Sequence, residues 1–569
     1  MAQVTGLNSK SEPNHNNNNH ETEPGKFSLL RPSGLGQNEG NTQVVPDEAD
    51  LGLVSIIRAL DVDGRHYQTV SNILGELNSN PAIISYRQDT LYELLRLPDL
   101  VEQFSEVLPQ LIELASTGRS KGWGDSLPLP QIAARLAELE IYLNCVEMLW
   151  AALKNYDEGR GAQSAALAGL RARLVQARED PIFQNLIVEL PGLRSRLSQA
   201  SSVTLGINLD AQLRPESATL LSVNQDRFSG KGGLMQRLLG ERAASEALRG
   251  STSLYPANEN RPRTPEHELF RELERILEKV ASPVAAALSR YTRVSSAWLA
   301  ALEPEVAFYL GAVRLVHEMR QAGLAFSRPE IAPMAENTGQ LHNCYSLDLA
   351  LRLKPGNRQH EVVANEVNFS STGHIFIITG PNSGGKTTYT RAIGQAQLLF
   401  QAGLPVPATT ARLSPVDAIY THFAREERAD ASGGRLAQEL TSLGQIFRKA
   451  SRHSLVLLNE PLTGTDHVSA GSLGKDLLAG LKLLGARAIF VTHLHELLDD
   501  PSLSPDHGIV SLVAVATMQN TGGPAFQPSY KIIPGLPRAL ANAAELARQH
   551  GLSLNQITQT LRERGMLVD

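Results

Sequence analysis

The sequence predicts an α/β domain with a mostly parallel sheet, preceded by a mainly α-helical region that carries a small insertion. From about residue 341 onward, short apolar strand patterns alternate with helical patterns, and such alternation is typical of a parallel sheet. Apolar residues recur at helical spacing over residues 51–200 and again over 265–323. Between them, residues 201–224 form short alternating runs separated by turn residues, which predicts small strands.

Length and composition limit the classes of protein to which the chain can belong. Its 569 residues suggest about three or four domains, and a hydrophobic content of 42% is enough for packed cores. Two cysteines, Cys145 and Cys344, cannot form a disulfide framework or a four-cysteine metal site. The net charge of -6 excludes a uniformly basic nucleic-acid coat. Because no apolar run approaches about 20 residues and no signal pattern opens the chain, we expect a cytoplasmic protein without a membrane partner.

Residues 1–47 are predicted to form a disordered, low-complexity tail. They contain few large apolar side chains, so they cannot bury enough surface to offset the entropy lost on ordering. A run of Asn and His at 14–20 could bind a metal ion, but a solvated tail explains the same composition. Residues 48–200 follow as a helical core domain, whose helical pattern is broken at Pro98.

Three further units are predicted after the helical core. Residues 201–263 form the small insertion, and residues 264–335 form helices that lead back to the body. These helices should be kinked or divided at Pro283 and Pro304, because proline interrupts a helix. Residues 336–569 then form the α/β domain.

The strongest motif is the glycine-rich stretch Gly380–Thr387, with the sequence GPNSGGKT. It fits the pattern G-x-x-x-x-G-K-[ST] and lies between a predicted strand, HIFIIT, and a predicted helix. In such a loop, backbone N–H groups surround phosphate oxygens, and the helix N-terminus adds partial positive charge. Lys386 is expected to reach the β- and γ-phosphates of a nucleotide, and the Thr387 hydroxyl to ligate Mg²⁺. A structural glycine-rich turn is the alternative.

Two further motifs follow buried strands and place polar side chains at the sheet edge where ligands bind in parallel sheets. Glu460, in HSLVLLNE, is placed to orient or deprotonate water beside a γ-phosphate, with a capping carboxylate as the alternative. Asn459 stands where an Asp usually supports Mg²⁺, so weaker metal binding or slow turnover is expected. His493 follows RAIFVT and is expected to sense the γ-phosphate, with a structural histidine as the alternative.

Together, these motifs resemble the ATPase domain of the MutS DNA mismatch-repair family, a branch of the ABC-type P-loop ATPases. The likeness is dense over residues 341–569, in the stretches GPNSGGKTTYTRAIGQAQLLFQAGLPVPA, LVLLNEPLTGT, VTHLHEL and YKIIPGLPRALANAAELARQHGLSLNQI. It is weaker in ISYRQDTLYELLRLPDL and in the order of clamp and lever over 48–335. The resemblance implies a P-loop fold for residues 336–569, ATP and Mg²⁺ as cofactors, a clamp-like role for residues 201–263 and a lever role for residues 264–335.

The resemblance also implies a role for each motif residue. Lys386, Glu460 and His493 would be catalytic, and Thr387 and Asn459 would hold the metal. The residues implied to hold the nucleotide are Gly380, Pro381, Asn382, Ser383, Gly384, Gly385, Lys386, Thr387 and Thr388. In this family two ATPase domains dimerise, and a Ser-bearing signature loop of one subunit completes the other subunit's site. That loop corresponds to Ser432, Gly433 and Gly434, and Asp466 matches the loop that crosses the interface. The family's Ser falls near Gly434 without a gap and on Ser432 after a small shift.

Two domains of the larger family members have no counterpart in the resemblance to this sequence. Members that repair mismatches carry an N-terminal mismatch-reading domain with a Phe-x-Glu wedge, followed by a connector. Here the helical core is expected to begin near residue 50, which leaves no room for either, and no nuclease-like extension is expected after Asp569. Two Phe-x-Glu strings, at 104–106 and 270–272, lie in helical patterns and are interpreted as chance matches.

Three functional hypotheses follow. The first is a homodimeric ATPase that closes on duplex or branched DNA and has a repair or recombination protein as a further partner. The insertion supports it, since residues 214–263 contain eight Arg or Lys against five Asp or Glu. The second is a nucleotide-dependent dimer with weak hydrolysis that acts on a protein partner, favoured by the acidic balance and by Asn459. The third is an ATPase paired with a membrane transporter, and it leaves the long helical stretches over 51–200 and 265–323 unexplained.

Overall fold

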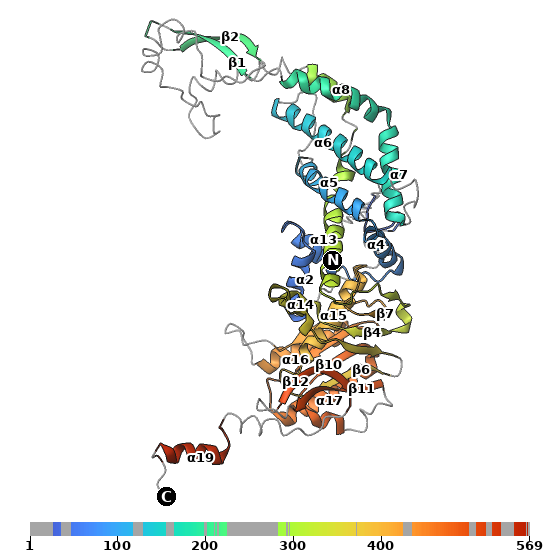
Figure 1. Ribbon diagram of the computed structural model, residues 1–569, viewed down its shortest axis with the longest axis vertical. Helices are drawn as coiled ribbons and strands as arrows, with labels where there is room; N and C mark the ends of the chain where they lie inside the picture. Colours follow the sequence, from blue (N-terminus) through green and yellow to red (C-terminus); the bar gives the residue numbers. More distant parts are fainter. Residues whose placement is uncertain are drawn as a thin grey trace, which may run out of the picture.

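The computed structural model describes residues 27–35, 47–117, 129–154, 164–198, 202–209, 211–212, 215–224, 283–291, 294, 296–370, 373–424, 435–499, 508–518, 526–535, 551–564 and 566. An α/β part lies at one end of the molecule, stacked helices extend from it, and a two-stranded hairpin lies at the far end (Figure 1). No helix in these ranges is long and apolar enough to cross a lipid bilayer.

Within the described residues, eight helices precede the hairpin, and α12 and α13 lie between it and the α/β part. Their bounds are α1 (Glu48–Leu51), α2 (Leu53–Leu60), α3 (Tyr67–Gly75), α4 (Pro81–Leu94), α5 (Pro98–Thr117), α6 (Leu129–Lys154), α7 (Ala165–Glu179), α8 (Pro181–Ser198), α12 (Ala297–Ala300) and α13 (Glu303–Gln321). Two expected breaks are confirmed, because Pro98 begins α5 and Pro304 lies in the first turn of α13. Proline suits these positions because the first helical N–H groups need no intrahelical acceptor. The break at Pro283 stays a prediction, since the residues before it lie outside the described ranges.

The segment 27–31 packs against these helices, and here the expectation of a solvated N-terminal tail is wrong. Leu29 and Leu30 are buried in the helical core. The Leu29 N–H donates to the Glu305 carboxylate at 2.6 Å, and the Arg87 guanidinium donates to the Leu30 carbonyl at 2.9 Å. Two buried leucines with paired backbone groups are enough to order a short segment whose surroundings are polar.

The insertion contains an antiparallel hairpin, as its alternating pattern predicts. β1 (Ser202–Leu209) pairs with β2 (Pro215–Asn224). Residues 225–263 of the insertion lie outside the described ranges, and the boundaries of the predicted domains stay predictions.

The α/β part contains two sheets. The larger has the strand order β12-β11-β6-β10-β9-β8, and the smaller has the order β3-β7-β4-β5. The strands are β3 (Glu330–Ile331), β4 (Gly339–Cys344), β5 (Asn365–Phe369), β6 (Gly373–Thr379), β7 (Thr410–Leu413), β8 (Ile419–Phe423), β9 (Leu455–Asn459), β10 (Arg487–Val491), β11 (Gly508–Met518) and β12 (Phe526–Pro534). The larger sheet is parallel except where β11 meets β12, which confirms a mostly parallel sheet.

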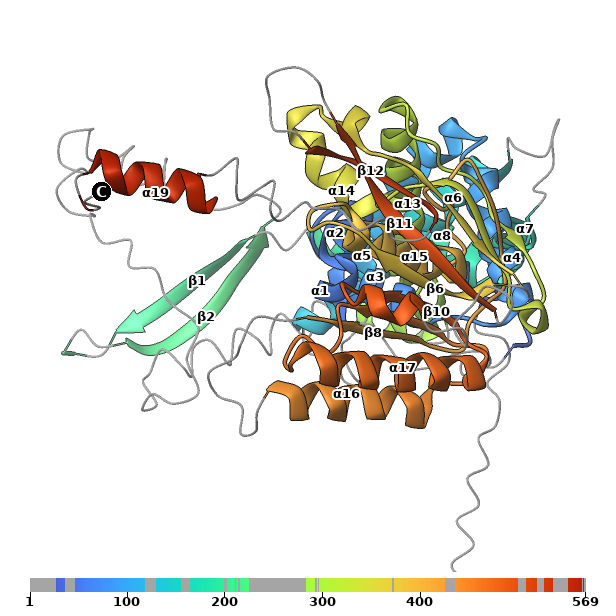
Figure 2. The same ribbon diagram turned by 90° about the horizontal axis from the view of Figure 1, so that it is seen from below.

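Helices cover both faces of the larger sheet. The helices that follow β4 along the chain are α14 (Leu347–Leu353), α15 (Lys386–Gln401), α16 (Arg435–Lys449), α17 (His467–Leu484) and α19 (Leu554–Glu563), of which α19 is drawn apart from the sheets in Figure 1. α16 and α17 lie side by side on one face, and α15 lies on the other (Figure 2). Every residue of β9 and β10 is buried, which explains why both strands read as continuous apolar runs.

α15 also joins the α/β part to the helical part. The Arg391 guanidinium donates to the carbonyl of Asp50 at 2.8 Å, and the Gln395 amide donates to that of Leu51 at 2.7 Å. At its other end, the Gln401 amide donates to the Asn78 carbonyl at 3.1 Å. A displacement of α15 is therefore transmitted directly to α1 and to the loop after α3.

His66 forms a second link inside the helical part, between the loop before α3 and the start of α13. Its side chain is 7% exposed, its Nδ1 lies 2.8 Å from the Asp63 carboxylate, and its Nε2 contacts Glu303. A third carboxylate, that of Asp61, lies 3.9 Å from Nδ1. Burial by itself lowers the pKa of His66, but the hydrogen bonds to Glu303 and Asp63 outweigh it and raise the pKa above the ordinary value of 6.5.

This raised pKa predicts a pH-dependent stability. The contribution of charged His66 is complete below a pH of about 6.5 and is lost as the pH rises through the higher pKa of the folded state. We therefore expect the free energy of unfolding to fall as the pH rises above about 6.5, and His66→Gln to flatten this slope. Urea denaturation at several pH values measures both slopes, and parallel slopes for the two proteins would contradict the assignment.

Candidate functional site

A glycine-rich loop connects β6 to α15 at the carboxyl edge of the larger sheet. Three of its residues have positive φ: Gly380 (125°), Ser383 (64°) and Gly385 (90°). A Cβ at Gly380 would lie 2.9 Å from the Cβ of Ala514 on β11, so a side chain there would require β11 to shift. The loop is therefore closely packed on the sheet and turns its backbone around the start of α15.

Lys386, the first residue of α15, points back into this loop. Its side chain is 4% exposed, and Nζ donates to the carbonyl oxygens of Gly380 at 2.9 Å and Pro381 at 3.0 Å. Burial lowers the pKa of Lys386, and the carboxylate of Glu460, 3.9 Å away, partly offsets this effect. The ammonium group of Lys386 therefore lies inside the glycine-rich loop.

Thr387 and Asn459 form a pair of oxygen-bearing groups beside the loop. The Thr387 hydroxyl donates to Oδ1 of Asn459 at 3.1 Å, which joins the start of α15 to the end of β9. Asn459 is buried. Hydroxyl and amide oxygens are suitable partners for a hard cation and its water shell, but neither carries negative charge.

Glu460 and His493 lie next to each other where β9 and β10 end. Nε2 of His493 is 3.0 Å from Oε1 of Glu460. The hydrogen bond from His493 lowers the pKa of Glu460, partial burial opposes it, and the positive charges of His493 and Lys386 add to it. Glu460 also has a φ of 53°, and its N–H donates to the Val491 carbonyl at 3.0 Å. A left-handed conformation in a non-glycine residue costs about 1 kcal/mol and recurs at functional sites.

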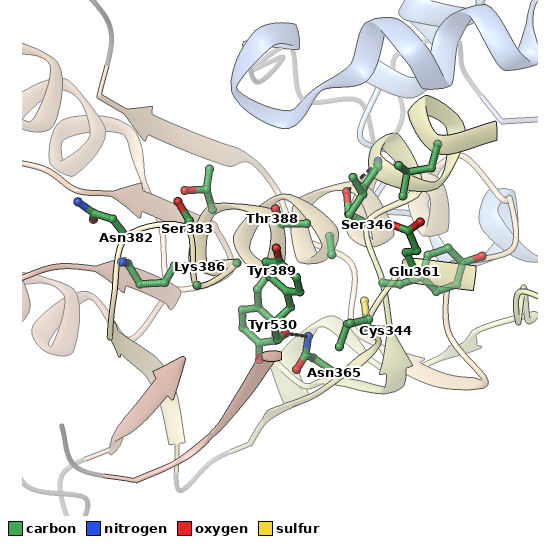
Figure 3. Close-up of a pocket in the computed structure, with 18 of the residues that line it drawn as sticks. Cys344, Ser346, Glu361, Asn365, Asn382, Ser383, Lys386, Thr388, Tyr389 and Tyr530 are labelled. Atoms are coloured by element: carbon green, nitrogen blue, oxygen red, sulfur yellow. Dashed lines mark hydrogen bonds between the residues drawn. The ribbon is translucent and has the colours of Figure 1, made fainter. Parts of the chain in front are cut away.

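A cavity of about 410 Å³ opens beside these groups. In Figure 3, Lys386 and Asn382 lie at one end, Glu361 and Cys344 lie at the other, and Tyr530 lies between them. The residues from the sequence analysis that line it are Asn382, Ser383, Gly384, Gly385, Lys386, Thr387, Thr388 and Glu460. Gly380, Pro381, Asn459 and His493 contact these lining residues. Size, buried cation and loop together suit a ligand with several phosphates and an organic group.

Sequence analysis missed Tyr530, which lines the middle of this cavity (Figure 3). Tyr530 on β12 is 47% exposed and has a φ of 57°, and a Cβ at Gly385 would lie 3.4 Å from its ring. The Asn365 amide holds this strand, donating to the Tyr530 carbonyl at 3.1 Å and accepting from the Ile532 N–H at 2.8 Å. These contacts join β5 to β12, which are far apart in the sequence, so no local pattern predicts them.

Of the residues expected to act across a dimer, Asp466 is described by the structure, and it does not line this cavity. The Asp466 carboxylate caps α17, accepting from the N–H groups of Val468 and Ser469 at 3.1 and 3.0 Å. Ser432, Gly433 and Gly434 lie outside the described residues. Glu439 on α16 accepts a hydrogen bond from the Gly464 N–H at 3.3 Å, so α16 contacts the loop before α17.

Two family models match the chain. One, described as MutS domain V, matches residues 376–535, which include most of β6, the glycine-rich loop and the strands that carry Glu460 and His493. The other, described as MutS2 N-terminal domain, matches residues 79–322, which include α4 to α13.

Several relatives named Endonuclease MutS2 are similar to parts of the chain. The protein from Streptococcus uberis is 32% identical over 192 residues, which cover 34% of this chain and 24% of the relative. That from Streptococcus pneumoniae serotype 19F is 28% identical over 288 residues, which cover 50% of this chain and 33% of the relative. The matched regions thus span about a quarter to a third of the length of these relatives.

Proposed function

We propose that this chain, which belongs to the MutS family, binds and hydrolyses ATP with Mg²⁺ at an ABC-type P-loop site and uses its ATP state to close a homodimer on duplex or branched DNA. One observation supports the proposal most. Lys386, Glu460 and His493 converge at the edge of the sheet beside a glycine-rich loop. This constellation suits phosphoryl transfer to water.

The residues present fit both ATP and Mg²⁺. The positive φ values of Gly380, Ser383 and Gly385 curl the loop at the start of α15, and backbone N–H groups in such a loop can surround phosphate oxygens. The Thr387 hydroxyl and the Asn459 amide offer oxygen atoms, the donors that Mg²⁺ prefers. Mg²⁺ at this position would neutralise charge on the phosphates.

Each polar group has a distinct task in hydrolysis. The positive charge of Lys386 stabilises negative charge on the β- and γ-phosphates. Because Lys386 lies inside the loop, it also determines where these phosphates bind. Ionised Glu460 accepts a proton from the attacking water or orients it. His493 contacts Oε1 of Glu460 and would respond to the γ-phosphate through this contact. Tyr530 provides a ring against which the nucleoside can pack.

DNA binding and closure rest on the family membership and on the insertion. Two subunits would meet at their ATP sites, where Ser432, Gly433, Gly434 and Asp466 of one would complete the site of the other. A cytoplasmic location is part of the proposal.

Charge reversal in the insertion tests the DNA contact. Arg227, Lys231 and Arg237, which lie outside the described residues, would contact phosphates without regard to sequence. Changing all three to Glu is expected to weaken DNA binding by at least about tenfold at low salt and to reduce the salt dependence of the affinity. Fluorescence anisotropy with labelled duplex measures both. Unchanged affinity and salt slope would remove the insertion from the DNA interface.

A second candidate function is a nucleotide-dependent dimer that acts on a protein partner with weak hydrolysis. Asn459 favours it, because a neutral amide supports Mg²⁺ less well than the usual carboxylate. Measured turnover that is slow in the presence of saturating Mg²⁺, together with no binding to any DNA form, would select this function.

A further inference from the structure

The metal side of the proposed ATP site borders a second cavity, of about 370 Å³. Thr387 and Asn459 form part of its wall, and Arg391, Phe423 and Ala424 continue it. The remaining wall comes from the helical part of the chain, through Asp47, Ala49 and Asp50. Two acidic residues from a distant segment therefore line the same cavity as Thr387 and Asn459, the pair assigned to Mg²⁺.

The position of this acidic segment is fixed by hydrogen bonds to α15. The Arg391 guanidinium donates to the carbonyls of Asp50 and Ala49, at 2.8 and 3.3 Å, and the Gln395 amide donates to the carbonyl of Leu51 at 2.7 Å. Arg391 also lies over the ring of Phe423, with 5.8 Å between guanidinium carbon and ring centre. Since Thr387 and Arg391 share α15, the acidic segment is held in one register with the residue that would bind the metal.

The two carboxylates differ in exposure and in local use. Asp47 is exposed, and its Oδ1 accepts from the Ala49 N–H at 2.9 Å to cap α1. Asp50 is 6% exposed. A buried negative charge acts through a lower effective dielectric than an exposed one, so Asp50 has the larger influence on a cation at Thr387 and Asn459.

Building on the proposed function, we infer that Asp50 supplies the negative charge that Asn459 lacks, and so supports Mg²⁺ from the helical part of the chain. Mg²⁺ keeps several of its waters when it binds, so a carboxylate can stabilise it by accepting hydrogen bonds from that water shell. The cavity between Asp50 and the Thr387–Asn459 pair has room for such water. Arg391, which also lines this cavity, donates to the carbonyls of Ala49 and Asp50 and so keeps α1 beside the metal pair.

This arrangement connects the metal to the helical part of the chain, through α1, α2 and α13. α1 leads directly into α2, whose C-terminal carbonyls accept hydrogen bonds from Arg314 on α13, including that of Ala59 at 2.8 Å. Metal binding therefore stabilises the contact between α1 and α15, on which the position of the helical part depends. If the carboxylate that supports Mg²⁺ came from the α/β part itself, metal binding would have no such connection to the helical part.

Metal titration tests the inference without relying on turnover. Mn²⁺ binding is measured by electron paramagnetic resonance in the presence of a non-hydrolysable ATP analogue, and analogue binding is measured separately in EDTA. Asp50→Asn is expected to weaken Mn²⁺ binding by about 10- to 100-fold, as is usual for loss of an outer-shell carboxylate, and to leave metal-free analogue binding unchanged. Asp47→Asn, which keeps the capping oxygen, is the matched control and is expected to stay within about twofold.

A second-site change makes the test specific. In the Asp50→Asn background, Asn459→Asp is expected to restore Mn²⁺ affinity to within about threefold of the wild type, because it returns the charge to the same space. Mn²⁺ affinity of Asp50→Asn within about twofold of the wild type would overturn the inference. If the wild type binds no analogue, the proposed ATP site itself is wrong. If Asp50→Asn does not fold, Asn459→Asp alone decides: a gain below about threefold supports the inference, and a gain of tenfold or more contradicts it.

Discussion

Lys386→Ala is expected to reduce ATP affinity and ATP hydrolysis by at least about 100-fold. The reason is the location of Nζ, which is buried inside the glycine-rich loop and bonded to the carbonyls of Gly380 and Pro381. No other Lys or Arg lines this end of the cavity among the described residues, so no neighbouring charge can replace it. Binding of a fluorescent ATP analogue and steady-state phosphate release measure the two effects.

The matched control for this change is Lys475→Ala, which removes an exposed lysine from α17. It is expected to leave both quantities unchanged, because α17 covers the sheet face opposite to α15. Turnover by Lys386→Ala near the wild-type rate would refute the assignment of the glycine-rich loop.

Glu460→Gln is expected to retain ATP binding and to slow hydrolysis by at least about 100-fold. Glutamine has the same shape and can accept the hydrogen bond from His493, but it cannot take a proton from water. ATP should therefore accumulate on the protein, and a dimer that depends on ATP should persist. Rapid-quench measurement of hydrolysis and analytical ultracentrifugation with ATP and Mg²⁺ check the two statements.

Glu496→Gln serves as the control, since this exposed glutamate lies close in sequence to His493 but does not line the cavity. It should hydrolyse ATP at the wild-type rate. If Glu460→Gln turns over normally, another group is the base and the role of the Glu460–His493 pair is structural.

The architecture of the α/β part could be predicted because its signals are local. HIFIIT, LVLL and AIFV are short apolar runs that end in polar residues, and they become β6, β9 and β10. Residues 27–31 could not be predicted in the same way. Their order depends on contacts with Arg87, Glu305 and Tyr309, which come from two distant helices. The composition of the whole N-terminal tail is polar on average, so it gives no sign that Leu29 and Leu30 pack against the helices.

In the candidate site, too, the residues with local sequence signals could be predicted and those placed by distant contacts could not. Lys386, Thr387, Asn459, Glu460 and His493 follow strand ends, and a parallel sheet brings such residues to one edge. Tyr530 and Asp50 approach that edge from segments that no spacing rule connects to it. Only the pairing of β12 with β11 and the packing of α1 on α15 bring them there.

The central claim, that ATP state controls the grip of this protein on DNA, is tested most directly by competition binding at fixed salt. Purified protein is offered intact duplex, a duplex with a single mismatch and a four-way junction, each with and without ATP and Mg²⁺. We predict that at least one of these forms is bound and that ATP changes its affinity by about tenfold or more, the size of a typical coupling between two sites. Absence of binding to every form at low salt, or affinities that do not respond to ATP, would contradict the account.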